Sequence, residues 1–351
     1  MEIKNSRECF LDLLRIIACF LVIVNHTNSV IFLGTTPQNL TWFVSLAYFF
    51  VSKIAVPVFF MISGYLLLNK KDDLKKSLQR FSRIAVVLIV WGFIYAIYKS
   101  CYVNSDPSFL NIIQMALSTF RKSPTNALWY LYTYLGILLM LPFLQKMTSL
   151  MTKRDYHIFF IISITCYSVL PILTHYFPNF RLSSDFQLPL FGGYICMLLI
   201  GQYFSRFEIK KTKLRFFVSC LLFAIMVVFN VVATYFEYTK SDSKYLFFDN
   251  RTFFPILLQS VCVFYMASFV RFSKNFGKII SYIGSCTFGI YLISDMSIGF
   301  LKPFYLKAAT YIHPIFAVVI FEIIVFAVGF VVVTLLKKIP LVKKVVWYFV
   351  W

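Results

Sequence analysis

The residues of this chain that could do chemistry begin with Asp12, Arg15 and His26, in an otherwise apolar stretch at residues 10–33. In an α-helix, Arg15 and His26 would lie within about 20° of each other around the axis and about 16 Å apart along it. Asp12 precedes Arg15 by three residues, a spacing at which the two side chains can pair. A carboxylate-held guanidinium with an imidazole on the same helix face is suited to binding an anionic or carbonyl group and to moving a proton.

Each of these residues also has a purely structural explanation. Asp12 and Arg15 could form an ion pair near the lipid headgroups, and a lone buried histidine is usually bonded to a backbone carbonyl. Three further histidines lie near the ends of apolar stretches, where water can solvate them: His157, His175 and His313. Because His26 lies deep inside its stretch, it is the candidate general base or proton relay. Asn25, beside it, is a candidate substrate-binding residue.

The next apolar stretch, residues 43–69, contains Lys53, Pro57 and the run Ser63-Gly64-Tyr65. A proline inside such a helix kinks it and frees a carbonyl. The small pair Ser63-Gly64 lets another helix approach closely, and this packing alone could explain both residues. The alternative is that Ser63, Gly64 and Tyr65 bind substrate. Lys53 either extends its amine toward the headgroups or faces a partner inside the protein.

Four more polar or aromatic residues are candidates for substrate binding. Trp129 and Tyr130 open a later apolar stretch, and Tyr291 and Asp295 lie within another. The aromatic pair could belong to an interfacial belt or could stack on a sugar ring. Asp295 needs a polar partner at that depth, and Lys53 is a possible cation for it.

The composition determines which elements must position these residues. The 351 residues are 60% hydrophobic and 14% charged, with a mean hydropathy of +0.78, which excludes a soluble globular enzyme. A membrane-spanning helix needs roughly 20 apolar residues. Ten stretches of that kind predict an all-α, polytopic bundle of about ten transmembrane helices, at residues 10–33, 43–69, 81–101, 127–145, 156–175, 187–205, 214–236, 253–271, 279–301 and 313–336.

The charges predict the orientation of this bundle. The formal net charge is +20, from 34 Lys and Arg against 14 Asp and Glu. With a cytoplasmic N-terminus, 23 of the cations fall on inner segments and 9 on outer ones, as the positive-inside rule requires. Ten spans then place both termini in the cytoplasm. The cations therefore serve topology in a lipid bilayer, and no nucleic-acid partner is expected.

The chain is expected to form a single integral membrane domain over residues 1–351. Residues 341–351 are basic and amphipathic and would lie on the inner leaflet or form a frayed tail. The eight cysteines include no CxxC pair, and no zinc-ligand spacing occurs. We therefore expect no metal and no bound cofactor.

Four motifs resemble the acyltransferase-3 family of integral membrane acyltransferases. They extend over almost the whole chain, and the combination of the first two is specific. They are Leu11-Asp12-x-Leu-Arg15-Ile-x-Ala18 with His26 after ten further residues, Ala55-Val-Pro57-x-Phe59-Phe60-x-Ile-Ser63-Gly64-Tyr65-Leu66, Leu128-Trp129-Tyr130-Leu131 and Thr287-Phe288-Gly289-Ile290-Tyr291-Leu292.

This resemblance implies acyl transfer, usually of acetyl from acetyl-CoA, to a hydroxyl of a cell-surface polysaccharide or a lipid-linked sugar, in the plasma membrane of a bacterial cell. His26, Arg15 and Asp12 would be its catalytic residues, and Asn25 and Ser63 would be candidate donors to the tetrahedral oxyanion. One position departs from the pattern, since many relatives have a histidine where this chain has Ser294. The alternative function is a polytopic transporter or flippase for a lipid-linked glycan, for which a helical bundle with a kinked span and embedded charges is equally suited.

Overall fold

A computed structural model of the whole chain describes residues 2–34, 39–104, 107–180, 192–241 and 247–339. Within these residues the secondary structure is helical throughout, without a β-strand, which confirms the all-α class. The predicted interfacial tail at 341–351 lies outside the described residues.

The chain divides into two compact units. The first comprises Met1–Lys70 and Lys146–Ser281, and the second comprises Lys71–Gln145 and Tyr282–Trp351. Helix α6 (Trp129–Leu150) and helix α12 (Lys274–Gly284) contribute residues to both.

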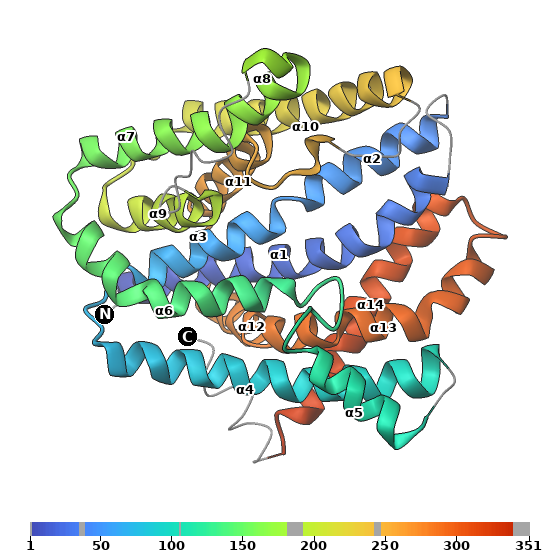
Figure 1. Cartoon of the computed structure of the whole chain (residues 1–351). Helices are drawn as coiled ribbons and strands as arrows, with labels where there is room; N and C mark the ends of the chain where they lie inside the picture. Colours follow the sequence, from blue (N-terminus) through green and yellow to red (C-terminus); the bar gives the residue numbers. More distant parts are fainter. Residues whose placement is uncertain (1, 35–38, 105–106, 181–191, 242–246, 340–351) are drawn as a thin grey trace. The chain divides into compact units, whose positions relative to one another are not determined.

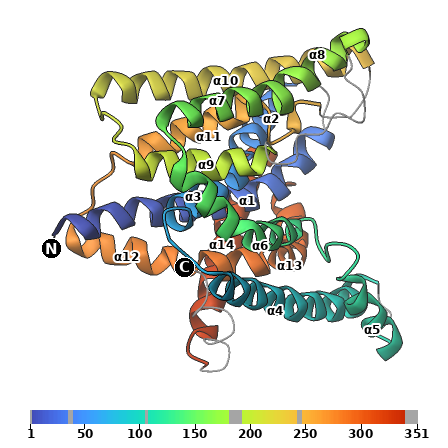
Figure 2. The same ribbon diagram turned by 60° about the vertical axis from the view of Figure 1, so that its left-hand side comes forward.

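The other helices of the first unit include α1, which runs without interruption from Glu2 to Gly34. Figure 1 shows the α2–α3 pair lying along α1, with α9 beside α3. Figure 2 shows α10 and α11 next to each other. The helices of this unit are α1 (Glu2–Gly34), α2 (Leu40–Ser52), α3 (Ala55–Leu67), α7 (Lys153–Ile164), the π-helix η2 (Thr165–Val169), α8 (Leu170–Tyr176), the 3₁₀ turn η3 (Pro178–Phe180), α9 (Gly193–Arg206), α10 (Lys213–Ser241), the 3₁₀ turn η5 (Phe247–Asp249) and α11 (Phe254–Ala267).

The second unit pairs α13 with α14 and packs α5 on α4. Its remaining helices are α4 (Leu74–Tyr98), the π-helix η1 (Lys99–Val103), α5 (Phe109–Ser118), α13 (Thr287–Ala308) and α14 (Pro314–Leu336).

Side-chain caps determine where several of these helices begin. Asp73 accepts a hydrogen bond from the Lys76 amide (2.9 Å) at the start of α4. Thr152 and Asp155 form a reciprocal capping box at the start of α7. Such caps satisfy amides that have no partner in the first turn of a helix.

The lengths and compositions of the helices identify a membrane protein. Among the described residues, six helical segments are long and apolar enough to cross a bilayer, and the bent pair α12–α13 could be a seventh. Helix α10 exposes Leu221 (61%) and Val228 (60%), and α14 exposes Ile323 and Val331. Helix faces that expose many apolar side chains are favourable in contact with lipid and unfavourable in contact with water. All ten predicted stretches fall at least in part on helices, while the count of ten spans and the position of the termini remain predictions.

Candidate active site

The predicted polar stripe lies on one unbroken helix. Arg15 Nη1 donates to Asp12 Oδ1, and both side chains are largely buried, at 11% and 13% exposure. Cys19 and Val22, farther along the same face, are buried too. The stripe therefore faces the protein, and the ion pair predicted from the spacing of three residues is present.

A serine that the sequence did not single out completes this ion pair. Ser281 Oγ, on α12, donates to Asp12 Oδ2 over 2.8 Å. The Cys9 thiol lies 3.9 Å from Ser281 Oγ and from the Gly277 carbonyl, so α12 packs on the first turns of α1. Small residues at Gly277, Ser281 and Gly284 share one face of α12, which indicates a packed face, but no local pattern connects Ser281 with Asp12.

His26 and Asn25 are half-buried in the outer half of the predicted stripe. Asn25 Oδ1 lies 3.5 Å from Ser52 Oγ, and the Ser52 hydroxyl donates to the nearer Phe49 carbonyl over 2.6 Å. Helix α2 therefore contacts α1 next to His26. A half-buried imidazole on a polar stripe can be reached by a substrate hydroxyl and can accept its proton.

Lys53 lies at a break in the second predicted span, between α2 and α3, and only 4% of it is exposed. It pairs with Asp249 and lies 3.9 Å from the centroid of the Phe49 ring. Its ion-pair partner within the first unit is therefore Asp249, in the turn η5. The pairing with Asp295, which belongs to the second unit, stays a prediction. The alternative that Lys53 extends its amine toward the lipid headgroups is wrong, because the amine is buried against protein groups.

Ser63, Gly64 and Tyr65 lie on α3. Ser63 is fully buried and donates to the Phe59 carbonyl of its own helix. A Cβ atom on Gly64 would lie 1.8 Å from the Leu198 carbonyl oxygen of α9, so this glycine is required for close packing. The Tyr65 ring meets Phe10 edge-on at 5.7 Å, which places it against α1. The packing explanation thus accounts for Gly64.

In the second unit the four remaining candidates meet around one peptide. Asp295 Oδ2 accepts from the Ala127 amide (3.2 Å), and the Tyr291 hydroxyl donates to the Ala127 carbonyl (2.7 Å). Trp129 and Tyr130 follow at the start of α6, and the Tyr130 ring contacts Tyr291 edge-on at 6.2 Å. The aromatic pair is therefore held in place by Tyr291 and Asp295, an arrangement that neither spacing nor composition indicated.

Ser294, at the position where many relatives have histidine, is buried and donates to the Tyr291 carbonyl (2.8 Å). It is therefore occupied within its own helix. Among the described residues, no group of three or more His, Cys, Asp or Glu side chains could hold a metal ion.

The chain was compared with known protein families, curated proteins and solved structures. A family model described as an acyltransferase domain matches residues 10–337, nearly the whole chain. No curated protein and no solved structure matches. Because this match covers nearly the whole chain, including all four motifs, the chain belongs to the acyltransferase-3 family of membrane acyltransferases.

Proposed function

We propose that this membrane acyltransferase is an O-acetyltransferase that moves an acetyl group from cytoplasmic acetyl-CoA to a sugar hydroxyl of a cell-surface polysaccharide or its lipid-linked precursor. The observation that carries the proposal is the stripe on α1. It combines a buried, carboxylate-held guanidinium with a half-buried imidazole on one continuous helix.

Arg15 is assigned to binding the acyl donor, acetyl-CoA. Its guanidinium is held by Asp12, which in turn is held by Ser281. A fixed guanidinium has donors in the planar arrangement that phosphate and carbonyl oxygens accept. In the predicted orientation Arg15 lies toward the cytoplasmic end of α1, and His26 lies about 16 Å farther outward. A donor entering from the cytoplasm and an acceptor entering from outside would then meet along this stripe.

His26 is assigned as the general base. It accepts the proton of the acceptor hydroxyl while the hydroxyl oxygen bonds to the acetyl carbonyl carbon. Collapse of the tetrahedral intermediate breaks the carbon–sulfur bond, and the proton passes from His26 to the leaving thiolate. In the alternative route, His26 first accepts the acetyl group and then transfers it.

Asn25 is the better supported of the two candidate oxyanion donors. Its side chain is half-buried beside His26, and its Oδ1 lies 3.5 Å from Ser52 Oγ. The Ser63 hydroxyl is fully buried and is used by the Phe59 carbonyl. We propose that Trp129 and Tyr130 stack on the sugar ring of the acceptor. Tyr291 and Asp295 would fix the position of these two residues through their hydrogen bonds to Ala127.

The decisive experiment compares two histidine variants of the purified, membrane-reconstituted protein. We expect His26→Ala to abolish the acceptor-dependent release of CoA thiol from acetyl-CoA. His157→Ala is the matched control, because His157 is exposed and contacts Tyr203 away from the stripe, and it should retain wild-type activity. Acetyl transfer at the wild-type rate by His26→Ala would contradict the assignment.

Two further measurements identify the route and the acceptor. Labelled acetyl-CoA supplied without acceptor should leave label on the protein only if His26 forms an acyl intermediate. Deletion of the gene should remove the acetyl methyl signals from the NMR spectrum of the surface polysaccharide.

A glycan transporter remains the second candidate, because the span formed by α2 and α3 is broken at a buried lysine, a feature that many transporters use at their substrate sites. It predicts movement of a lipid-linked glycan without consumption of acetyl-CoA. An unchanged polysaccharide spectrum in the deletion strain, together with loss of glycan export, would favour it.

A further inference from the structure

Lys53 is a buried cation at the position where the helix of the second predicted span is interrupted. Helix α2 ends at Ser52 and α3 begins at Ala55. Pro57 has no amide hydrogen, so the carbonyl four residues before it, that of Lys53, loses its helical partner. A cation at the end of α2 is favoured by the helix dipole, and the Phe49 ring below the amine adds a cation–π contact. The opposite charge comes from Asp249.

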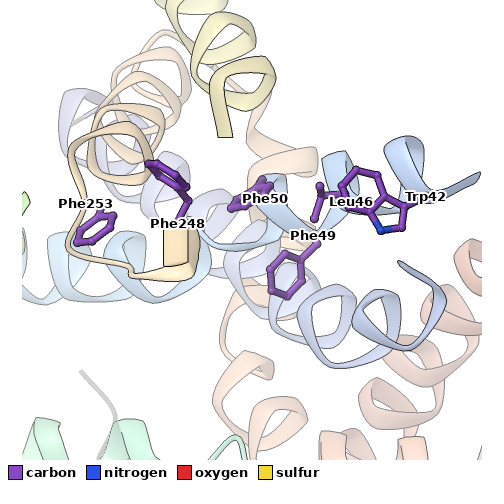
Figure 3. Packing of buried hydrophobic residues seen from close by; sticks show 6 residues of the cluster. All are labelled: Trp42, Leu46, Phe49, Phe50, Phe248 and Phe253. Atoms are coloured by element: carbon purple, nitrogen blue, oxygen red, sulfur yellow. The ribbon is translucent and has the colours of Figure 1, made fainter. Parts of the chain in front are cut away.

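Asp249 belongs to the segment 247–254, which contacts α2, η2 and α8 through several side chains. Phe248 and Phe253 join a buried cluster with four residues of α2, and Figure 3 shows these two rings at one end of that cluster. The Phe254 amide donates to Ser168 Oγ over 2.6 Å. The Phe247 ring stacks on His175, with the centroids 3.9 Å apart. The carboxylate is therefore presented by a fixed backbone and does not simply follow the lysine.

The other side of the break contacts the catalytic helix. Ser52, next to Lys53, is 1% exposed and lies within 3.5 Å of Asn25 Oδ1. Asn25 directly precedes His26. A continuous set of contacts thus leads from Asp249 through Lys53 and Ser52 to the residue beside the proposed base.

We propose that Asp249 is a positioning residue for the transfer reaction: by pairing with Lys53 it fixes the α2–α3 break, and the break fixes Asn25 and His26 on α1. This inference rests on the proposed function, because it assigns Asp249 to the His26 step. A base displaced by about 1 Å can lose two orders of magnitude in rate, so a fixed break is of direct consequence for transfer.

The test uses purified full-length protein and measures two quantities for each variant, the thermal unfolding temperature and the kcat and KM for acetyl-CoA. Asp249→Asn leaves a buried, unpaired cation, so it should lower both the unfolding temperature and kcat, the latter by about tenfold or more. The KM for acetyl-CoA should stay unchanged, because Arg15 is far from the break along α1. Asp249→Glu should keep most of kcat.

The double variant Lys53→Met with Asp249→Asn separates positioning from stability. Replacing both partners of a buried ion pair with uncharged groups is often neutral for stability, so the unfolding temperature should recover. We expect kcat to stay low, because the break is no longer fixed by charge. Glu208→Gln, an exposed carboxylate in the linker after α9, is the matched control and should resemble wild type.

If the double variant recovered both the unfolding temperature and kcat, Asp249 would have only a stabilising role and the inference would be overturned. A wild-type kcat for Asp249→Asn would overturn it as well. Failure of the proposed function gives a different result, since His26→Ala would then transfer acetyl groups like wild type. A wild-type protein without transferase activity would contradict both.

Discussion

At the scale of single residues, the Asp12 carboxylate uses its two oxygens for two different partners. Oδ1 accepts from Arg15 on the same helix, and Oδ2 accepts from Ser281 on α12. A carboxylate held on both sides has little freedom to rotate, so it transmits a fixed position to the guanidinium. Ser281 is therefore expected to act on the donor step through Arg15.

Removing the Ser281 hydroxyl tests this directly. A hydrogen bond to a charged group contributes about 1.5–3 kcal/mol, so Ser281→Ala should raise the KM for acetyl-CoA by about tenfold, and Ser281→Thr should restore it. Steady-state kinetics with varied acetyl-CoA provide the measurement. Ser82→Ala is the control, because Ser82 is exposed and bonds only within its own helix. An unchanged KM in Ser281→Ala would separate Ser281 from donor binding.

Local spacing predicted one of these contacts and not the others. Asp12 and Arg15 are three residues apart on a helix, so helical geometry alone brings them together. Ser281 and Asp12 are 269 positions apart, and Asp249 is likewise remote from Lys53. Such contacts arise from the packing of distant helices, and neither periodicity nor composition encodes them.

At the scale of helices, α3 and α9 cross with their backbones in contact at two points. A Cβ on Gly64 would lie 1.8 Å from the Leu198 carbonyl oxygen, and one on Gly201 would lie 1.8 Å from the Met61 carbonyl oxygen. Directly after Gly201, the buried Gln202 amide donates to Thr148 and to the Leu68 carbonyl. The position of α3, and so of Tyr65 against α1, depends on this crossing.

We predict that Gly64→Ala forces the two helices apart. Overpacking commonly costs about 1–3 kcal/mol, and here the obstructing atom is backbone, which cannot rotate away. The thermal unfolding temperature in detergent should fall clearly. Gly136→Ala, on α6, is the matched control because no atom lies within 4 Å of the position that its added methyl group would take; it should unfold like wild type. Equal unfolding temperatures for the two variants would show that α3 and α9 can separate without loss.

The break between α2 and α3 shows how far the sequence could predict an element. Pro57 predicts a kink, and the helix is interrupted around its i−4 residue, Lys53, as proline chemistry requires. The 49° bend between α12 and α13 has no such signal, and the predicted stretch 279–301 crosses it. The bend lies at Ser285 and Cys286, directly after Gly284.

At the scale of the whole molecule, the number of spans depends on the helices that are shorter or less apolar than a typical transmembrane helix. Helices α9 and α11 each have 14 described residues, about 21 Å of helix, against about 30 Å of hydrocarbon. Helix α6 is long enough, but its tyrosines make it less apolar than the six clear spans. The ten-span prediction depends on these three helices and on the bent pair α12–α13 crossing the membrane.

Cysteine labelling in intact cells can decide whether α6 crosses. Lys122 precedes α6 and Lys153 follows it, and both are exposed. If α6 spans and the N-terminus is inside, a membrane-impermeant maleimide should label Lys122→Cys in intact cells of a cysteine-free variant. It should label Lys153→Cys only after permeabilisation, because the 23-to-9 division of cations places Lys153 inside.

The same pair of tests across α9 uses Asn179→Cys outside and Glu208→Cys inside. Labelling of both members of a pair in intact cells would place the helix between them on one side of the membrane, and the alternation of charged segments would then require a different count.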